Sequence, residues 1–329
     1  MTNRRSILAL SAAMAMTMTG AHAAQGEAPI EEAAPSEAAL TPEEQAAAAE
    51  YEAWATAFEE SLDRKTGAVD LAGHQVRLTV PEDYYYLSKA DARRVLEEAW
   101  GNPEDDSTLG MIFPAGVSPL DEGAIGVNLT YDADGYVSDA DANEIDYDDL
   151  LDQMQRGTRE ENDWRYENGY GAIELVGWAE RPDYDAEAHE MVWAKHLRFL
   201  PYPDGLTDEE MTAYASDTLN YNVRELGRKG VFNANFIASI DQLEEVREAA
   251  PDVLAMIAYK EGYRYDDYRE GDKVAAYGIA GMVAGGGLLA KKAGLIGVLV
   301  LVLKKFGVFI LAGAAALFGT VRKMFGAKG

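Results

Sequence analysis

The sequence contains no cysteine, and histidine is almost as scarce. The absence of thiols excludes disulfides and all thiolate chemistry, and it suits an oxidising compartment without proving one. The four histidines are His22, His74, His189 and His196. None has a partner at the spacing of a zinc-binding helix, and His189 and His196, seven residues apart on a predicted strand, are expected on opposite faces. We therefore do not expect zinc catalysis.

Local catalytic and nucleotide-binding motifs are also missing. The chain has no G-x-S-x-G elbow, no phosphate-binding loop and no dinucleotide fingerprint. A glycosidase-like pair of carboxylates cannot be singled out among 57 acidic residues. The sequence thus predicts no catalytic, cofactor-binding or metal-binding residue and favours a non-enzymatic protein, while catalysis without a local signature stays open.

One short motif suggests calcium. Asp139, Asp141 and Asn143 have the D-x-D-x-N spacing of an EF-hand loop. However, Glu144 occupies the position of the obligatory glycine, and Leu150 occupies the position of the bidentate acid. We prefer an acid-rich loop followed by a helix N-terminus, where the helix dipole favours negative charge.

Basic residues are scarce outside the two ends of the chain. Two of the 29 lie in residues 1–23 and seven in residues 274–329, so residues 24–273 carry 20 against all 57 acidic residues, a formal charge of about −37. Such a surface repels phosphate backbones and anionic headgroups. The sequence therefore predicts no nucleic-acid partner, and we expect charged partners of this region to be cationic.

The N-terminal residues have the pattern of an export signal. Residues 1–23 combine Arg4 and Arg5, an apolar run from Ile7 and a small-x-small site at residues 21–23. Both the general and the twin-arginine export routes remain open. Residues 24–40, rich in Ala, Glu and Pro, are predicted to be a mobile leader. Either route would place the main domain in the periplasm of a bacterium.

Acidic residues are absent from the C-terminal segment, residues 274–329. Residues 274–290 and 306–321 are apolar runs near the short end of a bilayer span, and the lysine pairs within residues 291–305 favour an interfacial connection. We predict a membrane anchor built as a helical hairpin, with a single span as the competing topology. Gly281 and Gly285 form a GxxxG pair that would allow close helix packing, within the hairpin or against another protein.

The region between these ends, residues 41–273, is predicted to be an α+β domain with a mainly antiparallel sheet and flanking helices. Helical periodicity marks residues 41–62, 87–100, 145–164 and a segment after Ile240, whereas residues 68–80 indicate a hairpin. Strand-rich segments joined by short links imply antiparallel pairing. These segments are residues 108–116, 124–131, 171–180, 189–200, 217–226 and 231–240, with residues 181–183 and 227–230 as links.

Several ordered motifs stand out along the chain. They are WGNP, LGMIFPAG, DGYVSD, IELVGWAERPDYD, MVWAKHL, LNYNVRELGRKG and DKVAAYGIAG. Together they resemble one bacterial family, the domain of unknown function 2167, from about Gly67 to the end of the chain. The resemblance implies a periplasmic domain on a membrane anchor and brings no catalytic residues.

The best candidate site is a polar sheet face. It comprises His196 and Arg198 on one strand and Asn220, Asn222 and Arg224 on another, where basic groups within an acidic domain could receive an anion or a partner's carboxylates. The alternative is a solvated face whose arginines pair with local acids.

These features together predict an inner-membrane protein whose C-terminal anchor is embedded in the lipid bilayer. We expect it to bind or position a membrane or periplasmic protein and to need no cofactor. A membrane-tethered hydrolase of envelope carbohydrate or peptide is the alternative.

Overall fold

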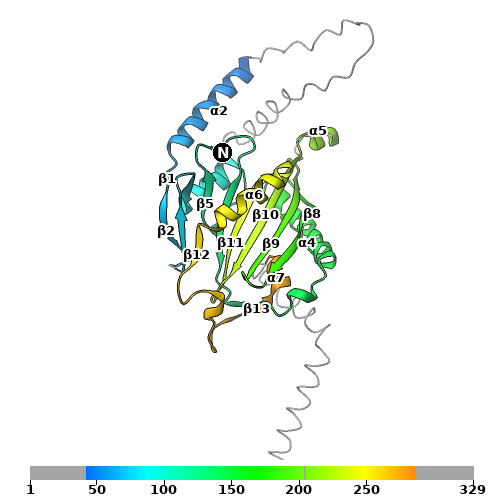
Figure 1. The fold of residues 1–329 in the computed structure, drawn as a ribbon. Coiled ribbons are helices and arrows are strands. Elements are labelled where there is room, and N and C mark those ends of the chain that lie inside the picture. Colours follow the sequence, from blue (N-terminus) through cyan, green and yellow to red (C-terminus); the bar gives the residue numbers. More distant parts are fainter. Residues whose placement is uncertain (1–41, 74, 204, 286–329) are drawn as a thin grey trace, which may run out of the picture.

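The computed structural model describes residues 42–73, 75–203 and 205–285. Its main sheet has eight strands, and every neighbouring pair is antiparallel. The predicted α+β class with a mainly antiparallel sheet is confirmed (Figure 1). In spatial order the strands are β1 (Arg64–Lys65), β4 (Tyr84–Ser88), β5 (Thr108–Pro114), β6 (Gly126–Asp132), β11 (Val231–Ser239), β10 (Ser216–Leu226), β9 (Glu190–Phe199) and β8 (Ile173–Asp185).

Two smaller sheets and a set of helices complete the domain. The three-stranded sheet contains β12 (Ile257–Tyr259), β3 (Val76–Val80) and β2 (Gly67–Leu71), and the two-stranded one pairs β13 (Val274–Gly278) with β7 (Tyr136–Ser138). The α-helices are α2 (Pro42–Glu60), α3 (Lys89–Arg94), α4 (Tyr147–Glu167), α5 (Asp208–Ala213), α6 (Leu243–Leu254) and α7 (Ile279–Val283). A single π-helical turn, Val95–Ala99, continues α3.

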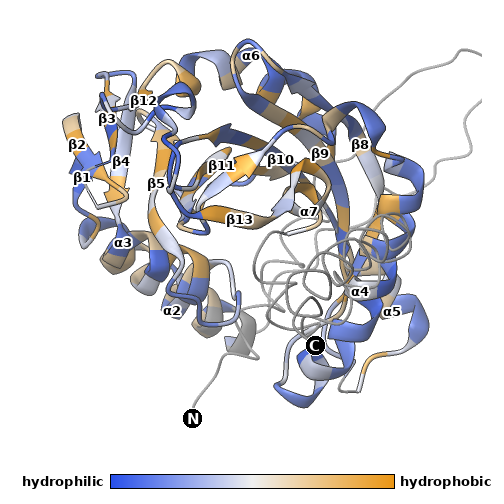
Figure 2. Cartoon of the chain, turned by 90° about the horizontal axis from the view of Figure 1, so that it is seen from below, coloured by the Kyte–Doolittle hydropathy of each residue, from blue (hydrophilic) through white to orange (hydrophobic). Residues whose placement is uncertain are grey.

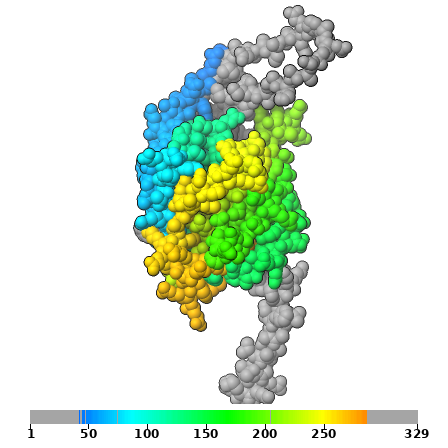
Figure 3. Space-filling view, in the orientation of Figure 1, coloured from blue at the N-terminus to red at the C-terminus, as the bar shows by residue number. Residues whose placement is uncertain are grey.

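One face of the main sheet, which we call the core face, packs into the largest apolar cluster. Leu219, Tyr221 and Val223 of β10 lie on it beside Ala234 and Phe236 of β11. Helix α6 and the three-stranded sheet cover this face. Figure 3 shows α6 lying on the front of the molecule, over the strands that Figure 1 shows behind it. Burial of this face is the main apolar contribution to stability.

The opposite face is apolar only towards its two sides. At β4 and β5, Leu87, Met111 and Phe113 pack against α3 and the end of α2. At β9, Met191 and Trp193 pack against α7, β7 and α4. Figure 2 shows the sheet curving around β13 and α7, with α6 outside the curve. The part between these two apolar clusters, on β6, β11 and β10, is polar.

Most predicted elements are confirmed. Helix α2 forms within the predicted range 41–62, and its Phe58 is 2% exposed. Strands β2 and β3 form the predicted hairpin, and the side chain of Ser88 caps α3 by accepting from the Asp91 N–H at 3.4 Å. Strands β4, β7 and β12 were not predicted. Their short lengths, three to five residues, give little periodicity.

The predicted link at residues 181–183 is wrong, because β8 continues through it to Asp185. The strand has register shifts here, and Asp183 still pairs with Val192. Pro182 is tolerated because β8 is the last strand of the sheet, where a missing N–H donor breaks no ladder.

The predicted membrane helix over residues 274–290 also differs from the structure. Residues 274–278 form β13, which pairs in parallel with β7, and residues 279–283 form the short helix α7. Ile279 is fully buried, and Met282 and Val283 are each 2% exposed. This apolar run therefore begins inside the folded domain, because its side chains fill a protein core and its backbone completes a sheet.

Two aspartates of the motif considered for calcium make hydrogen bonds within the fold, and one of them, Asp141, contacts this C-terminal segment. The carboxylate of Asp141 accepts the N–H groups of Ile279 and Ala280 at 2.9 and 3.3 Å, and that of Asp139 accepts the Tyr184 hydroxyl at 3.0 Å. Across the described ranges, no three His, Asp or Glu side chains are grouped to hold a metal.

Within residues 42–285, no helix is long and apolar enough to cross a membrane. The predicted signal, leader, second span (306–321) and interfacial segment (291–305) lie outside the described residues.

Candidate functional site

The polar part of the second face consists of five asparagines and two cations. We call it the asparagine face and define it by Asn128 of β6, Asn220, Asn222 and Arg224 of β10, Asn233 and Asn235 of β11, and Lys195 of β9. Register places Asn222, Asn235 and Asn128 opposite one another on adjacent strands. Asn220 lies opposite Lys195, and Arg224 lies opposite Asn233. Residues opposite one another point to the same side of a sheet.

Strand alternation explains how the sequence builds this face. On β10, Asn220, Asn222 and Arg224 alternate with the buried Leu219, Tyr221 and Val223, as predicted. The same alternation on β11 sets Asn233 and Asn235 between buried alanine and phenylalanine residues. This signal was present in the sequence of β11, but it was not used to predict those asparagines. Lys195 and Asn128 can be placed on this face only when the pairing register of the strands is known.

Hydrogen bonds connect part of the asparagine face. The Asn222 amide donates to the Asn220 carbonyl at 2.9 Å, and the Asn235 amide donates to the Asn220 side-chain oxygen at 3.3 Å. The Asn233 amide donates to both Thr130 and Asp132. These bonds use the donor groups of three carboxamides and leave much of their acceptor capacity free.

Several buried polar atoms of this region have no hydrogen-bond partner among the described residues. They are the side-chain oxygens Oδ1 of Asn233 and Asn235, Nε of Arg224 and Nε1 of the neighbouring Trp193. Asn233 is 2% exposed and Trp193 is 1% exposed. An unpaired buried polar group costs about 1–3 kcal/mol, so four in one region call for an explanation.

The two cations of the face are close enough to repel each other. Burial, and to a smaller extent the charge of Arg224, lower the pKa of Lys195 to about 8. Burial likewise lowers the pKa of Arg224, whereas the Asp132 carboxylate opposes that shift from 3.8 Å. Among the described residues Lys195 has no ion-pair partner. The face therefore carries local positive charge within a strongly acidic domain.

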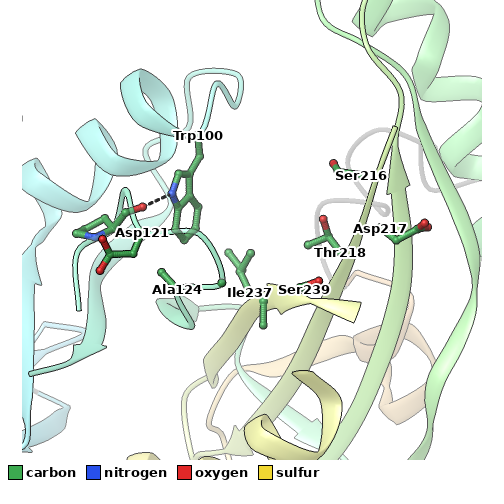
Figure 4. A pocket seen from close by; sticks show the side chains of 11 residues that line it. Trp100, Asp121, Ala124, Ser216, Asp217, Thr218, Ile237 and Ser239 are labelled. Carbon is green, nitrogen blue, oxygen red and sulfur yellow. Dashed lines mark hydrogen bonds between the residues drawn. The ribbon is translucent and has the colours of Figure 1, made fainter. Parts of the chain in front are cut away.

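A pocket of about 260 Å³ adjoins the asparagine face at the start of β10 and the end of β11. Figure 4 shows Trp100 on one side, with Ser216 and Thr218 of β10 on the other. The Trp100 indole donates to the Pro119 carbonyl at 2.9 Å. Gly126 lets Trp100 approach the sheet, because a Cβ there would lie 2.8 Å from the indole ring.

The structure divides the predicted site into two sets. His196 and Arg198 pair with Leu219 and Asp217, so they lie on the opposite face from Asn220, Asn222 and Arg224. His196 is 2.7 Å from the Asp217 carboxylate, and Arg198 donates two bonds to it at 3.0 and 3.2 Å. These bonds, with that from Arg198 the stronger, lower the pKa of Asp217. The two basic side chains thus pair with a local acid, as the alternative interpretation stated.

Gly281 and Gly285, considered as a membrane-helix contact, lie at the end of the domain. Gly281 is in the five-residue helix α7, and a Cβ there would lie 2.6 Å from the Tyr277 Cβ. Gly285 follows α7 and is exposed. In the described structure, the close approach at Gly281 serves packing against the neighbouring strand.

Residues 63–315 match a family described as protein of unknown function, DUF2167. The chain belongs to this family, and the predicted resemblance is confirmed. Among curated proteins, none matches the chain.

Similar solved structures include the solution structure of the cyanobacterial PsbP protein CyanoP from a Synechocystis species. Its TM-score is 0.31 at 10% identity, and the match covers 61% of this chain and 93% of that one. The Ran-binding protein Mog1p of Saccharomyces cerevisiae has a TM-score of 0.22 at 13% identity, with coverages of 60% and 96%. At such low scores we draw no conclusion about function from these structures.

Proposed function

We propose that this chain is an exported envelope protein, held at the bacterial inner membrane, whose periplasmic domain binds another envelope component through the asparagine face. The export pattern of residues 1–23 and the apolar run of residues 306–321 support this location. Because residues 274–285 belong to the domain, the single-span topology fits the described structure better than the hairpin.

The observation that carries the binding role is the set of buried, unpartnered polar atoms on one face. A protein that needed this surface only for stability would gain by replacing such groups with apolar ones. Carboxamides also neither release nor take up protons near neutral pH. The five carboxamides of the asparagine face are therefore suited to binding rather than to acid–base catalysis.

The absence of native cysteine permits a site-specific test. Ser216→Cys places one thiol at the exposed edge of the pocket, and Glu248→Cys places one on α6, beyond the core face. Intact cells carrying either full-length variant would be treated with a thiol-directed photocrosslinker. We expect a dominant adduct from Ser216→Cys only. The same adducts from both variants would contradict the proposal.

The same two variants test the location. A membrane-impermeant maleimide should label Glu248→Cys in cells whose outer membrane alone has been permeabilised. Labelling that requires rupture of the inner membrane would place the domain in the cytoplasm and contradict the proposed export.

One observation favours the alternative, a tethered hydrolase. Glu190 and Glu225 lie directly opposite each other on β9 and β10. Burial, and then the charge of Glu190, raise the pKa of Glu225 to about 8, which would keep it protonated at neutral pH as a general acid requires. If purified full-length protein cleaves envelope glycans or peptides and Glu225→Gln does not, the hydrolase is correct.

A further inference from the structure

We propose that the ligand of the asparagine face is an acidic peptide segment, whose carboxylate binds between Lys195 and Arg224. This inference rests on the proposed function and specifies its partner. Binding of such a peptide requires that the face attract an anion. It also requires that the face offer both hydrogen-bond donors and acceptors beside that anion. The described residues meet each of these requirements.

The first requirement is met by an excess of positive charge. Lys195 and Arg224 lie on adjacent strands, on the same side of the sheet, with Asn222 and Trp193 forming the row between them. The nearest acid, Asp132, is 3.8 Å from the Arg224 guanidinium and also accepts from Asn233 at 3.1 Å. One shared carboxylate leaves one positive charge uncompensated. A bound carboxylate would neutralise it and accept charge-assisted hydrogen bonds.

The second requirement separates a peptide from a simple anion. Nε of Arg224 needs an acceptor, whereas Oδ1 of Asn233 and Oδ1 of Asn235 need donors. Inorganic phosphate or a phosphate diester supplies mainly acceptors and would leave both asparagine oxygens unsatisfied. A peptide supplies carbonyl acceptors and N–H donors from the same backbone.

The arrangement of the carboxamides also fits an extended chain. Asn222, Asn235 and Asn128 form a row across three neighbouring strands. Adjacent strands are about 4.8 Å apart, so the row presents an amide group at regular intervals. A peptide lying across the strands would pass all three side chains and reach Lys195 or Arg224 at the β9 and β10 side.

The test compares two peptides that differ only in charge. Full-length protein in detergent micelles would be titrated with fluorescein-labelled Ala-Glu-Ala amide and with its twin Ala-Gln-Ala amide, and binding followed by anisotropy. We expect the acidic peptide to bind at least about tenfold more tightly, as a charge-assisted bond worth about 1.4 kcal/mol would give. Equal affinities, or no binding by either peptide, would overturn the inference.

Variants of single lysines test whether the preference for the acidic peptide arises at the asparagine face. Lys195→Met should abolish the preference for the acidic peptide, and Lys195→Arg should retain it because the charge remains. Lys229→Met, which removes an exposed lysine near Tyr263, is the matched control and should change nothing. A preference that survives Lys195→Met, or that disappears equally in Lys229→Met, would contradict the assignment.

Two further probes separate the peptide from other anions. Inorganic phosphate at the concentration of the peptide should not displace it, and a glucuronic-acid disaccharide should bind more weakly than the peptide. Displacement by phosphate or tighter binding of the sugar would overturn the peptide assignment. If the Ser216→Cys adduct persists while this inference fails, the proposed function stands with a different ligand.

Discussion

The two faces of the main sheet show opposite chemistry on the same strands. On the core face of β10 and β11, leucine, tyrosine, valine, alanine and phenylalanine pack beneath α6. On the other face, the alternate positions of these strands hold Asn220, Asn222, Arg224, Asn233 and Asn235. One face gains free energy from apolar burial, and the other buries polar atoms that have no hydrogen-bond partner in the part of the chain that the structure describes. The contrast separates a face that stabilises the domain from a face that we propose binds a partner.

The largest effect should come from the core face. Phe236 is fully buried and packs edge-on against Tyr221, with ring centroids 5.8 Å apart. Phe236→Ala should lower the free energy of unfolding by about 3–4 kcal/mol through lost burial and a cavity. Chemical denaturation of the full-length protein in micelles would measure it. Asn235→Ala, the preceding residue on the other face, is the control. Equal losses of unfolding free energy in the two variants would contradict the distinction between a stabilising core face and the asparagine face.

The next effect concerns the wall of the pocket. A Cβ at Gly126 would lie 2.8 Å from both the Trp100 ring and the Phe113 ring. Gly126→Ala should therefore displace Trp100 and destabilise the protein by about 1–3 kcal/mol, as overpacking does. Thermal unfolding and tryptophan fluorescence would detect the two changes. Gly157→Ala, on exposed helix α4 with open space at its Cβ, should not destabilise. An unshifted Trp100 signal in Gly126→Ala would contradict the close contact.

A third effect depends on pH. The pKa of Glu225, raised to about 8, exceeds the unfolded value of about 4.3. The folded state thus binds more protons between these values, and stability should fall as the pH rises from about 4.5 to about 8. Glu225→Gln should remove this slope and leave the variant more stable than the parent at pH 8, because a neutral amide at this buried position neither loses a proton nor has to bury a charge. The free energy of unfolding of both proteins would be measured across this pH range. The same pH dependence in the parent and in Glu225→Gln would contradict a raised pKa of Glu225.

The smallest stability effect should come from the asparagine face. Asn235→Leu removes an unpartnered oxygen and one long hydrogen bond to Asn220. Its free energy of unfolding should change by less than about 1 kcal/mol, or increase, because replacing poorly paired polar groups with apolar ones is nearly neutral. A loss as large as that of Phe236→Ala would mean that the face is structural.

Much of the fold could be predicted because its patterns are long. Helices α2 and α4 and strands β8 to β11 have enough residues to show their period, although the continuation of β8 past Pro182 was missed. The short strands β4, β7 and β12 could not be recognised, since they depend on tertiary partners. Residues 274–285 were misassigned because apolar composition alone does not distinguish a buried core segment from a membrane span.

Three residues of the asparagine face could be predicted from strand alternation. Asn220, Asn222 and Arg224 share one face as predicted, whereas His196 and Arg198 belong to the other. Pairing register between β9 and β10 decides this, and a shift of one residue would reverse it. Register depends on contacts across the whole sheet, so a single strand's sequence cannot supply it.

The central claim is that the asparagine face binds a component of the envelope. Its most direct test is the yield of the Ser216→Cys adduct in intact cells with and without Asn235→Leu, at matched protein levels and unchanged thermal stability. We predict that the dominant adduct is lost in the Asn235→Leu chain. An undiminished adduct in that chain would show that the partner is bound elsewhere.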